Sequence, residues 1–410
     1  MANTLVTPTW VTNETALRFM NSVKGVANFN RTYDSSYKQA GAKVGATVLA
    51  RLPQRYTVRR GQAWSPQNLY DQTVPITLSY QSGVDFEWSS AQETLELDRI
   101  KERYVNPAAD TLASDADAQG MADVYTSVWN SVGTLGTTPS ANLTYLQAKV
   151  KILDGSGPDD GYVAVLDPLA EATLVNANLA LFNPSATISE QYRKGQFGRG
   201  SLGIGEWYRD QNVPRHTSGT FTASTPLVNG ASQTGSTVIS NGWASGATSL
   251  KKGDILTIAG VNSVNPLSRV STGRLQQFVI TADISDTTGD MTFAISPSII
   301  TSGAYQTVSG SPASGAAITV WSAVAAGGTL ATTTSPQSLI FHPDFAAFVM
   351  ADLSDPVAGA KATFARSKDW GISLRMTQQW DIQTDQNRCR LDTLFGAAPL
   401  QPRLAARVVG

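Results

Sequence analysis

The sequence predicts an α+β protein into which a separate all-β region has been inserted, and three observations lead to this prediction. Residues 90–132 carry the strongest helical periodicity, with apolar side chains recurring every three or four residues. Residues 141–182 are typical of a helix, a strand and a second helix in turn. Residues 217–330 hold few charges, and short alternating strands recur there between turn signals such as KKGD and TTGD, as in an antiparallel sandwich or barrel.

Composition favours a structural protein over an enzyme. The chain has 410 residues, enough for two or three domains, but only 15% are charged, against about 25% in an average soluble domain. The net charge of -1 gives no overall basic field for nucleic-acid binding. The single Cys389 excludes a disulfide framework and a multi-cysteine zinc site, and two histidines leave little material for acid–base chemistry.

Membrane insertion and export are not expected. The sequence has no run of 18 apolar residues, so we expect no membrane partner. Its first 19 residues lack the basic and apolar regions of a signal peptide, and we therefore expect synthesis in a cytoplasm.

The first 80 residues are strongly basic and contain an extended hairpin. Nine basic and two acidic residues in positions 1–60 give this segment a net charge of +7. Residues 13–22 predict a short helix, and residues 46–80 predict a two-stranded, arginine-rich hairpin interrupted at Pro53. Because an isolated hairpin is marginal in water, this one is expected to rest on another surface.

The remaining elements alternate in type. The helix over 90–132 contains Pro107 and Gly120, which we expect to kink or split it. Residues 338–353 predict a strand followed by a helix, with His342 at the entry to the helix. Two strand patterns and an extended tail complete the chain.

No motif supports catalysis, cofactor binding or metal binding. Residues 198–203 match G-x-G-x-x-G, but neither a preceding apolar strand nor a following helix is expected, so glycine-rich turns are the better interpretation. His216 and His342 lack an accompanying G-x-S-x-G nucleophile elbow. Asp159 and Asp160 lack calcium-loop spacing and read as a polar surface loop.

The order of these parts resembles a tailed-phage major capsid protein of the Hong Kong 97 (HK-97) fold. It is most similar to the P-22-like podovirus coat family, whose A-domain carries an inserted β-barrel. The likeness rests on three stretches: KGQFGRGSLGIGEWYRDQNVPRHTSG, then SGATSLKKGDILTIAGVNSVNPLSR with QQFVITADIS, and finally DQNRCRLDTLFGAAPLQPRLAARV.

The resemblance implies a division into six segments. They are an N-arm (1–44), an E-loop hairpin (45–88), a P-domain spine helix (89–140), the first part of the A-domain with a glycine-rich P-domain turn (141–216), an inserted β-barrel domain (217–332), and an A-domain and P-domain return with a C-terminal tail (333–410).

The implied function is self-assembly into the icosahedral shell that encloses a double-stranded DNA genome. The expected partners are copies of the same chain in hexamers and pentamers, a separate scaffolding protein, a portal protein at one vertex and non-specifically contacted DNA. A separate scaffold is expected because only about 45 residues precede the hairpin. No cofactor is expected, and the location is the virion, after assembly in the bacterial cytoplasm.

Charge complementarity suggests the contact residues between subunits. The hairpin arginines can form bidentate pairs with carboxylates at the acidic start of the spine helix, where Asp85 and Glu87 are also counted. The candidates are Arg51, Arg55, Arg59, Arg60, Glu93, Glu96 and Asp98. Glu14, on the N-terminal helix, is the candidate for docking a basic scaffolding segment.

Two departures from related capsids are visible. Residues 229–247, where the family's inserted domain has a charged loop, contain no charge. No lysine lies between Lys43 and Lys101, so a covalent lysine crosslink from the hairpin is not expected. A phage tail or fibre protein, or a bacterial surface adhesin, is the alternative class, because such proteins also contain β-domains rich in Ser, Thr, Gly and Ala.

Overall fold

A computed structural model describes most of the chain, and the chain divides into two compact units. The described residues are 15–19, 22–32, 47–89, 104, 106–177, 201–221, 224–286, 288–321, 332–355, 361–367 and 372–410. Unit 1 comprises residues 1–50, 73–123 and 346–400, and unit 2 comprises residues 51–72, 124–345 and 401–410. Each unit is therefore assembled from three separate stretches of the chain.

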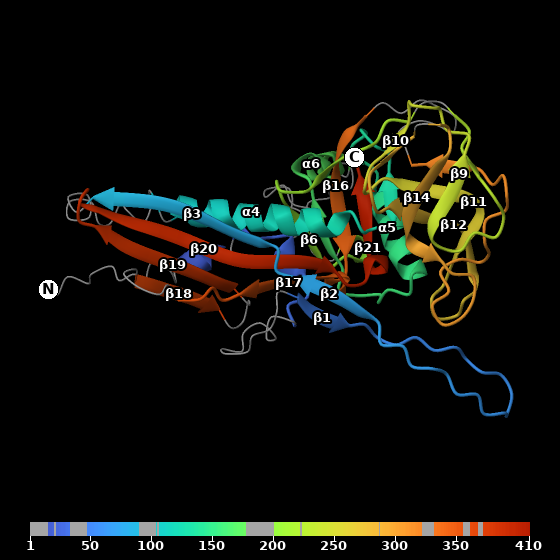
Figure 1. Cartoon of the computed structure of the whole chain (residues 1–410), viewed down its shortest axis with the longest axis horizontal. Helices are drawn as coiled ribbons and strands as arrows, with labels where there is room; N and C mark the ends of the chain where they lie inside the picture. The colour runs from blue at the N-terminus through green and yellow to red at the C-terminus, as the bar shows by residue number, and fades with distance from the viewer. Residues whose placement is uncertain are drawn as a thin grey trace, which may run out of the picture. The chain divides into compact units, whose positions relative to one another are not determined.

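Unit 1 is built on a five-stranded antiparallel sheet in which β20 (Gln386–Pro399) is the longest strand. The sheet order is β17 (Ala346–Ala351), β20, β19 (Ile372–Asp381) and β18 (Lys361–Ser367), and β3 (Tyr80–Ser89) also pairs along β20. A separate pair is formed by β1 (Thr47–Arg51) and β2 (Thr73–Thr77). Figure 1 shows this sheet in blue and red, since it joins early and late parts of the sequence.

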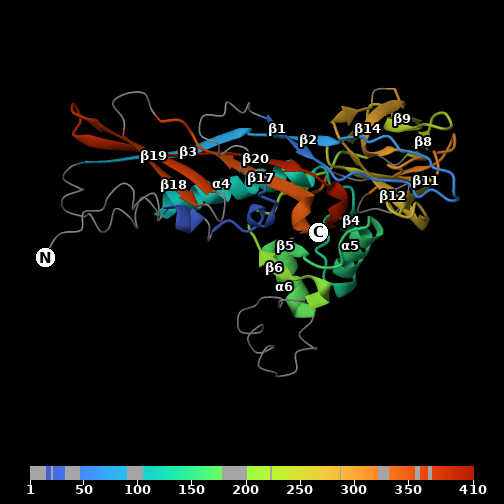
Figure 2. The same cartoon turned by 90° about the horizontal axis from the view of Figure 1, so that it is seen from below.

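Helix α4 (Asn106–Tyr125) lies along this sheet in both views (Figures 1 and 2). The Tyr80 hydroxyl donates to Asp123 Oδ1 at 2.8 Å, and the Ser82 hydroxyl donates to Asp115 Oδ2 at 2.6 Å. The helix contains Pro107 in its first turn, where a missing N–H is tolerated, and it continues through Gly120. The predicted split at Gly120 is therefore wrong, whereas the chain before Pro107 lies mostly outside the described residues and the prediction there stays open.

The C-terminal limit predicted for this helix is also wrong. The chain leaves the helix at Tyr125, and Val132 lies in β4 (Ser131–Gly133), which pairs in parallel with β21 (Ala405–Val409). Val128 and Val132 keep the four-residue spacing of the helix, but both are buried outside it. Pairing with a distant strand has overridden the local pattern.

A buried carboxylate attaches the N-terminal segment to α4. Asp117 is fully buried, and it accepts hydrogen bonds from the backbone N–H groups of Lys24 (3.0 Å), Gly25 (3.2 Å) and Val26 (2.8 Å). A Cβ at Gly25 would lie 2.8 Å from Met121 Sδ, and one at Gly120 would lie 2.5 Å from Val26 Cγ1. Glycine at both positions allows this close approach.

The N-terminal segment contributes little regular structure beyond this attachment. Residues 15–19 are helical, within the helix predicted over 13–22, and η1 (Val26–Asn28) is a short 3-10 turn. Phe19, Val23 and Val26 are buried.

In unit 2, a six-stranded sheet combines parallel and antiparallel pairs. Its order is β4, β21, β16 (Thr334–Phe341), β5 (Val163–Leu166) and β6 (Glu206–Arg209), and β7 (Arg215–Thr217) also pairs with β16. Helices α5 (Asn142–Asp154) and α6 (Pro168–Ala177) accompany β5 and β6 in Figure 2. The predicted sequence of helix, strand and helix is confirmed over these residues.

A second six-stranded sheet of unit 2 is entirely antiparallel. Its order is β15 (Ile318–Val320), β11 (Ile255–Val264), β12 (Ser271–Ile280), β14 (Met291–Ile299), β9 (Gly235–Asn241) and β8 (Leu227–Val228), beside a two-stranded pair of β10 (Ser249–Leu250) and β13 (Ile284–Ser285). The strands enclose their own apolar core, which includes Val238, Phe278 and Phe293. The short antiparallel strands predicted in this charge-poor segment are confirmed, with β11, β12, β14 and β15 among them.

The predicted helix after His342 is wrong. A short 3-10 turn, η5 (Pro343–Phe345), follows His342, and the next residues form β17, whose six residues are all buried. A continuous apolar run is compatible with either a buried helix or a buried strand, and pairing with β20 selects the strand here. Two further 3-10 turns are η4 (Ser201–Gly203) and η6 (Pro402–Leu404).

The described structure is thus a sheet-rich α+β fold with few helices. Within the described part of the chain, none of the helices combines the length and apolarity needed to cross a membrane.

Candidate inter-subunit surfaces and a buried polar network

The hairpin between β1 and β2 is braced by two glutamine side chains. Beyond Leu52, where the backbone N–H donates to Gln72 O, the two legs are joined by Gln54 and Gln67 rather than by a regular ladder. Gln54 bonds both the N–H and the carbonyl of Tyr70, and Gln67 bonds both the N–H and the carbonyl of Thr57. Pro53 explains the change, because it lacks an N–H and cannot continue the ladder.

The braced hairpin presents large apolar side chains that its own chain leaves uncovered. The Val58 and Trp64 residues are 85% and 84% exposed, and Tyr56, Leu69 and Tyr70 are also exposed. Such a group of exposed apolar side chains on a narrow hairpin is typical of a protein–protein contact surface. We call residues 51–72 the hairpin arm.

The four candidate arginines occupy different environments along the hairpin arm. Arg51 and Arg60 are exposed. The Arg59 guanidinium donates to the carbonyls of Gly61 and Ala63 and so closes the tip. Arg55 is partly buried, with its guanidinium 5.8 Å from the centre of the Tyr305 ring in the same unit. The pairing of these arginines with a neighbour stays a prediction.

The predicted carboxylate partners are only partly described. Glu14, Glu93, Glu96 and Asp98 lie outside the described residues.

Asp85 and Glu87 were expected at the acidic start of the spine helix, and this expectation is wrong. Both lie in β3, where Asp85 is 3.8 Å from Arg390 Nε and Glu87 is 3.8 Å from Arg388 Nε of β20. Their alternation with Val84, Phe86 and Trp88 has the two-residue period of a strand, not the period of a helix.

Charged side chains cross three neighbouring strands of the unit 1 sheet. Besides its contact with Glu87, Arg388 pairs with Asp381 at 2.9 Å. The fully buried Asp392 pairs with Arg390 at 2.6 Å and with Arg375 at 2.8 Å, and its carboxylate raises the pKa of Arg390. This surface is therefore neutralised by the chain's own residues.

His216 belongs to a buried polar network of unit 2. Its Nε2 lies 2.8 Å from Asp254 Oδ1, and its Nδ1 lies 3.4 Å from the Tyr125 hydroxyl. Asp254 Oδ2 accepts hydrogen bonds from the N–H groups of Lys251 (2.7 Å) and Gly219 (3.1 Å). Both members of the His216–Asp254 pair are only 6% exposed at the side chain, and the network ties β7 to the turn before β11.

A buried arginine extends this network to the C-terminal strand. Arg407 of β21 is 1% exposed, and it donates to the carbonyl of Gly253 at 2.9 Å. Burial lowers its pKa to about 10, against the opposing effects of Tyr125 and Asp254. The sequence did not single out Arg407 or Asp254, because a charged residue in a strand or a turn is ordinarily expected to be exposed.

His342, Asp159 and the glycine-rich motif, the other candidates from the sequence, make ordinary structural contacts. The His342 Nδ1 accepts the N–H of Asp344 at 3.3 Å and so caps η5, and Asp159 pairs with Lys149 at 3.3 Å. Of the G-x-G-x-x-G residues, only 201–203 are described; they form η4, which leads into the strand β6 and not into a helix. Among the described residues, no group of three or more His, Cys, Asp and Glu side chains could hold a metal ion.

The chain matches a known protein family over most of its length. The family model described as P22 coat protein, gene protein 5, matches residues 38–409. The chain is therefore the major capsid protein of a tailed phage, a structural component of the virion. It belongs to the P22 coat protein family.

Solved structures of phage capsids are also similar to this chain. A chain of Mycobacterium phage Che8 shares 15% identity with a TM-score of 0.44, covering 95% of this chain and 90% of that one. The capsid of Ralstonia phage GP4 shares 10% identity with a TM-score of 0.40, covering 92% and 84%. The CUS-3 coat protein I-domain shares 31% identity with a TM-score of 0.19, covering 24% of this chain and 96% of that one. No curated protein matched the sequence.

Proposed function

We propose that this coat protein adopts the HK-97 arrangement, with residues 217–332 as an inserted β-barrel domain, and assembles into an icosahedral shell around the genome. Assembly takes place in the host cytoplasm, from hexamers and pentamers of the chain. A separate scaffolding protein acts during assembly, a portal protein occupies one vertex, and the packaged double-stranded DNA is contacted without sequence specificity. The role is structural and involves no catalysis.

The hairpin arm carries this proposal. Its exposed Val58, Trp64 and Leu69 are more than 70% uncovered, although such side chains gain about 1.5–3 kcal/mol each from full burial. A neighbouring copy of the chain is the partner that every subunit of a shell meets at a fixed position. Many such contacts, each weak, close a shell without a strong individual bond.

The arginines of the arm add direction to these apolar contacts. Arg51 and Arg60 are exposed and can pair with carboxylates of a neighbour, among which Glu93, Glu96 and Asp98 are the proposed partners. Pairs of this kind contribute little affinity when exposed, but they set orientation and exclude incorrect contacts.

Electron microscopy tests the proposal directly. The full chain is expressed alone and together with the scaffolding gene of its phage, and both samples are imaged in negative stain. Icosahedral shells are expected, and shells only in the second sample would support an external scaffold. Small discrete oligomers in both samples would contradict shell assembly and favour a tail, fibre or adhesin role.

A substitution at Trp64 tests whether the exposed apolar side chains of the hairpin arm are needed for assembly. Trp64→Ser is expected to reduce shell yield roughly tenfold or more, while unfolding of the soluble chain changes by less than about 0.5 kcal/mol because the side chain is exposed. Leu267→Ser, at a similarly exposed position outside the arm (72%), serves as the matched control. Normal shell yield from Trp64→Ser would refute the role of the arm.

A charge reversal at Glu14 tests scaffold docking. Glu14→Lys is expected to lower scaffold-dependent assembly and to leave the soluble chain folded, because a basic scaffolding segment would then meet a like charge. Undiminished assembly with the scaffold would remove Glu14 from the docking site.

A further inference from the structure

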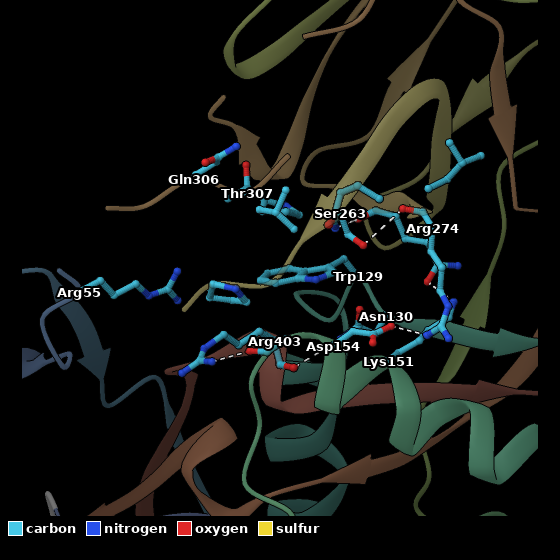
Figure 3. Close-up of a pocket in the computed structure, with 17 residues that line it drawn as sticks. Arg55, Trp129, Asn130, Lys151, Asp154, Ser263, Arg274, Gln306, Thr307 and Arg403 are labelled. Atoms are coloured by element: carbon cyan, nitrogen blue, oxygen red, sulfur yellow. Dashed lines mark hydrogen bonds and ion pairs between the residues drawn. The ribbon is translucent and has the colours of Figure 1, made fainter. Parts of the chain in front are cut away.

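A small cavity of unit 2 is surrounded by cationic side chains. Its volume is about 140 Å³, and its charged lining residues are Arg55, Lys151, Asp154, Arg274 and Arg403. They come from the hairpin arm, from α5, from β12 and from η6, and Figure 3 shows them together with Trp129, which also lines the cavity. The volume holds a few water molecules of about 30 Å³ each, and it is below the roughly 300 Å³ of typical organic-ligand pockets.

The charges around this cavity do not balance. Asp154 is the one carboxylate in the lining, and it is already paired with Arg274. Among the described residues, no ion pair involves Arg55, Lys151 or Arg403. Three cations therefore face a partly buried space without an ion-pair partner, although burying a charge is costly unless it is paired.

The hydrogen bonds of these cations leave donors unused. Lys151 Nζ donates to Ser131 O and to Gln277 Oε1, both at 2.6 Å. Arg403 donates to the carbonyls of Gly155 (2.6 Å) and Ser156 (3.2 Å), and to Gln401 Oε1 (2.8 Å).

The remaining donors are on the two arginines. The Nε of Arg403 is buried and has no hydrogen-bond partner, and within the described part of the chain no hydrogen bond is made by the Arg55 guanidinium. A guanidinium carries five N–H donors, so the pair retains several for a ligand.

The protonation behaviour of the lining reflects this unbalanced field. Burial, reinforced by Arg274 and opposed by Asp154, lowers the pKa of Lys151 to about 8. Burial and then the charge of Arg55 lower the pKa of Arg403 to about 10. Arg55 and Arg403 line the same cavity, so their like charges repel each other there.

We propose that this cavity binds a small oxyanion of the phosphate class, held between the guanidinium groups of Arg55 and Arg403. Planar guanidinium groups match the geometry of phosphate oxygens and can bond them in pairs. The bound anion cancels the repulsion between the two arginines and joins the stem of the hairpin arm to the turn that precedes β21. The site lies within one chain and does not depend on shell assembly.

Binding of inorganic phosphate to the soluble full chain tests this proposal. Calorimetric titration and thermal unfolding are carried out in chloride buffer at constant ionic strength, so that general salt effects are removed. Phosphate is expected to bind and to raise the melting temperature. Arg55→Gln and Arg403→Gln are each expected to weaken binding by roughly 10- to 100-fold, the loss of one charge-assisted contact.

Two arginine variants distinguish loss of phosphate binding from loss of folding. Arg55 donates no hydrogen bond within the described structure, so Arg55→Gln orphans no acceptor and should fold even if Arg403→Gln does not. Arg59→Gln, on the same arm but outside the cavity lining, is the matched control and should bind phosphate as the unaltered chain does. Absence of phosphate binding, or equal binding by Arg55→Gln, would overturn the proposal.

A second ligand tests whether the cavity binds a free oxyanion or a phosphate of a nucleic-acid backbone. A single-stranded ten-nucleotide DNA presents the same phosphate chemistry as diesters, but a cavity of about 140 Å³ is too small for nucleotides. It is therefore expected not to compete with inorganic phosphate. Binding of the oligonucleotide without binding of phosphate, abolished in Arg55→Gln, would overturn the proposal in favour of a nucleic-acid contact.

Discussion

A buried carboxylate of unit 1 and a cationic cavity of unit 2 differ in how far the fold satisfies their charge. In unit 1 the carboxylate of Asp117 is fully buried and receives three backbone N–H groups, so its charge is satisfied within the fold. In unit 2 the cations Arg55, Lys151 and Arg403 surround a cavity without a carboxylate for any of them. The first arrangement holds a segment in place, and the second leaves a capacity for binding.

The largest loss of stability is expected when the buried carboxylate of Asp117 is removed. Asp117→Ala leaves the buried N–H groups of residues 24–26 without an acceptor, at about 1–3 kcal/mol for each orphaned group. We expect the free energy of unfolding of unit 1 to fall by roughly 4 kcal/mol, measured by urea denaturation.

Asp115→Ala on the same helix is the control for this loss. Asp115 accepts one hydrogen bond, from the Ser82 hydroxyl, and its side chain is only partly buried. A loss of about 1 kcal/mol is expected there. If the two variants lost the same stability, the three-bond attachment at Asp117 would not be the source of its effect.

The buried Lys151 of unit 2, which has no ion-pair partner, predicts a stability that rises with pH. The pKa of Lys151 falls from 10.5 to about 8 on folding, so between these values the unfolded chain binds more protons than the folded one. Stability therefore rises with pH across this window, since the penalty for the buried ammonium is complete below about pH 8 and disappears towards pH 10.5. At 1.4 kcal/mol per pH unit the gain is up to about 3 kcal/mol.

Lys151→Met measures this contribution. The free energy of unfolding of both proteins is followed by denaturant titration from pH 7 to 10.5. The stability of the unaltered chain should rise relative to that of Lys151→Met across this range. The neighbouring acceptors keep partners in this variant, because Gln277 Nε2 also donates to Ser131 O at 3.1 Å. Parallel pH profiles of the two proteins would contradict an uncompensated charge at Lys151.

The smallest effect is expected for a charge pair that water already screens. Arg18 bonds Asp110 at 2.8–3.0 Å, but the side chains are 47% and 40% exposed. The hydrogen bond from Arg18 lowers the pKa of Asp110, so the pair stabilises above the unfolded value of about 3.8 and loses its effect as the pH falls further. Asp110→Asn should cost less than about 1 kcal/mol at pH 7.

Denaturant titration from pH 7 down to pH 3 checks the contribution of this pair. The difference between Asp110→Asn and the unaltered chain should shrink below pH 4, where the carboxylate of the unaltered chain becomes protonated. A loss as large as that of Asp117→Ala would show that exposure does not decide the strength of these carboxylate contacts.

Periodic segments of the sequence predicted their structure well. The helix, strand and helix at α5, β5 and α6 follow from local spacing, and so do the short strands of the charge-poor region. Where the pattern was ambiguous, distant pairing decided the outcome. The run AAFVMA forms β17 because β20 lies beside it, and Val132 joins β4 because β21 does.

The polar sites could not be predicted in this way. Asp117 reads as an ordinary solvent-facing residue of a helix, and nothing local shows that residues 24–26 will bring their N–H groups to it. The cavity joins Arg55 to Arg403, which are separated by most of the chain. The arm itself was visible in the sequence, whereas its bracing by Gln54 and Gln67 depends on contacts across 16 and 10 positions.

That bracing has a consequence for how the arm can change over evolution or by design. Two amide side chains set the register of the legs, and Gly61 at the tip, with a φ of +100°, has open space around it. Residues added between Gln67 and Thr57 on the tip side would lengthen the arm without shifting either strand at its base. The length of the hairpin arm can thus change without a change in the stability of the rest of the coat protein.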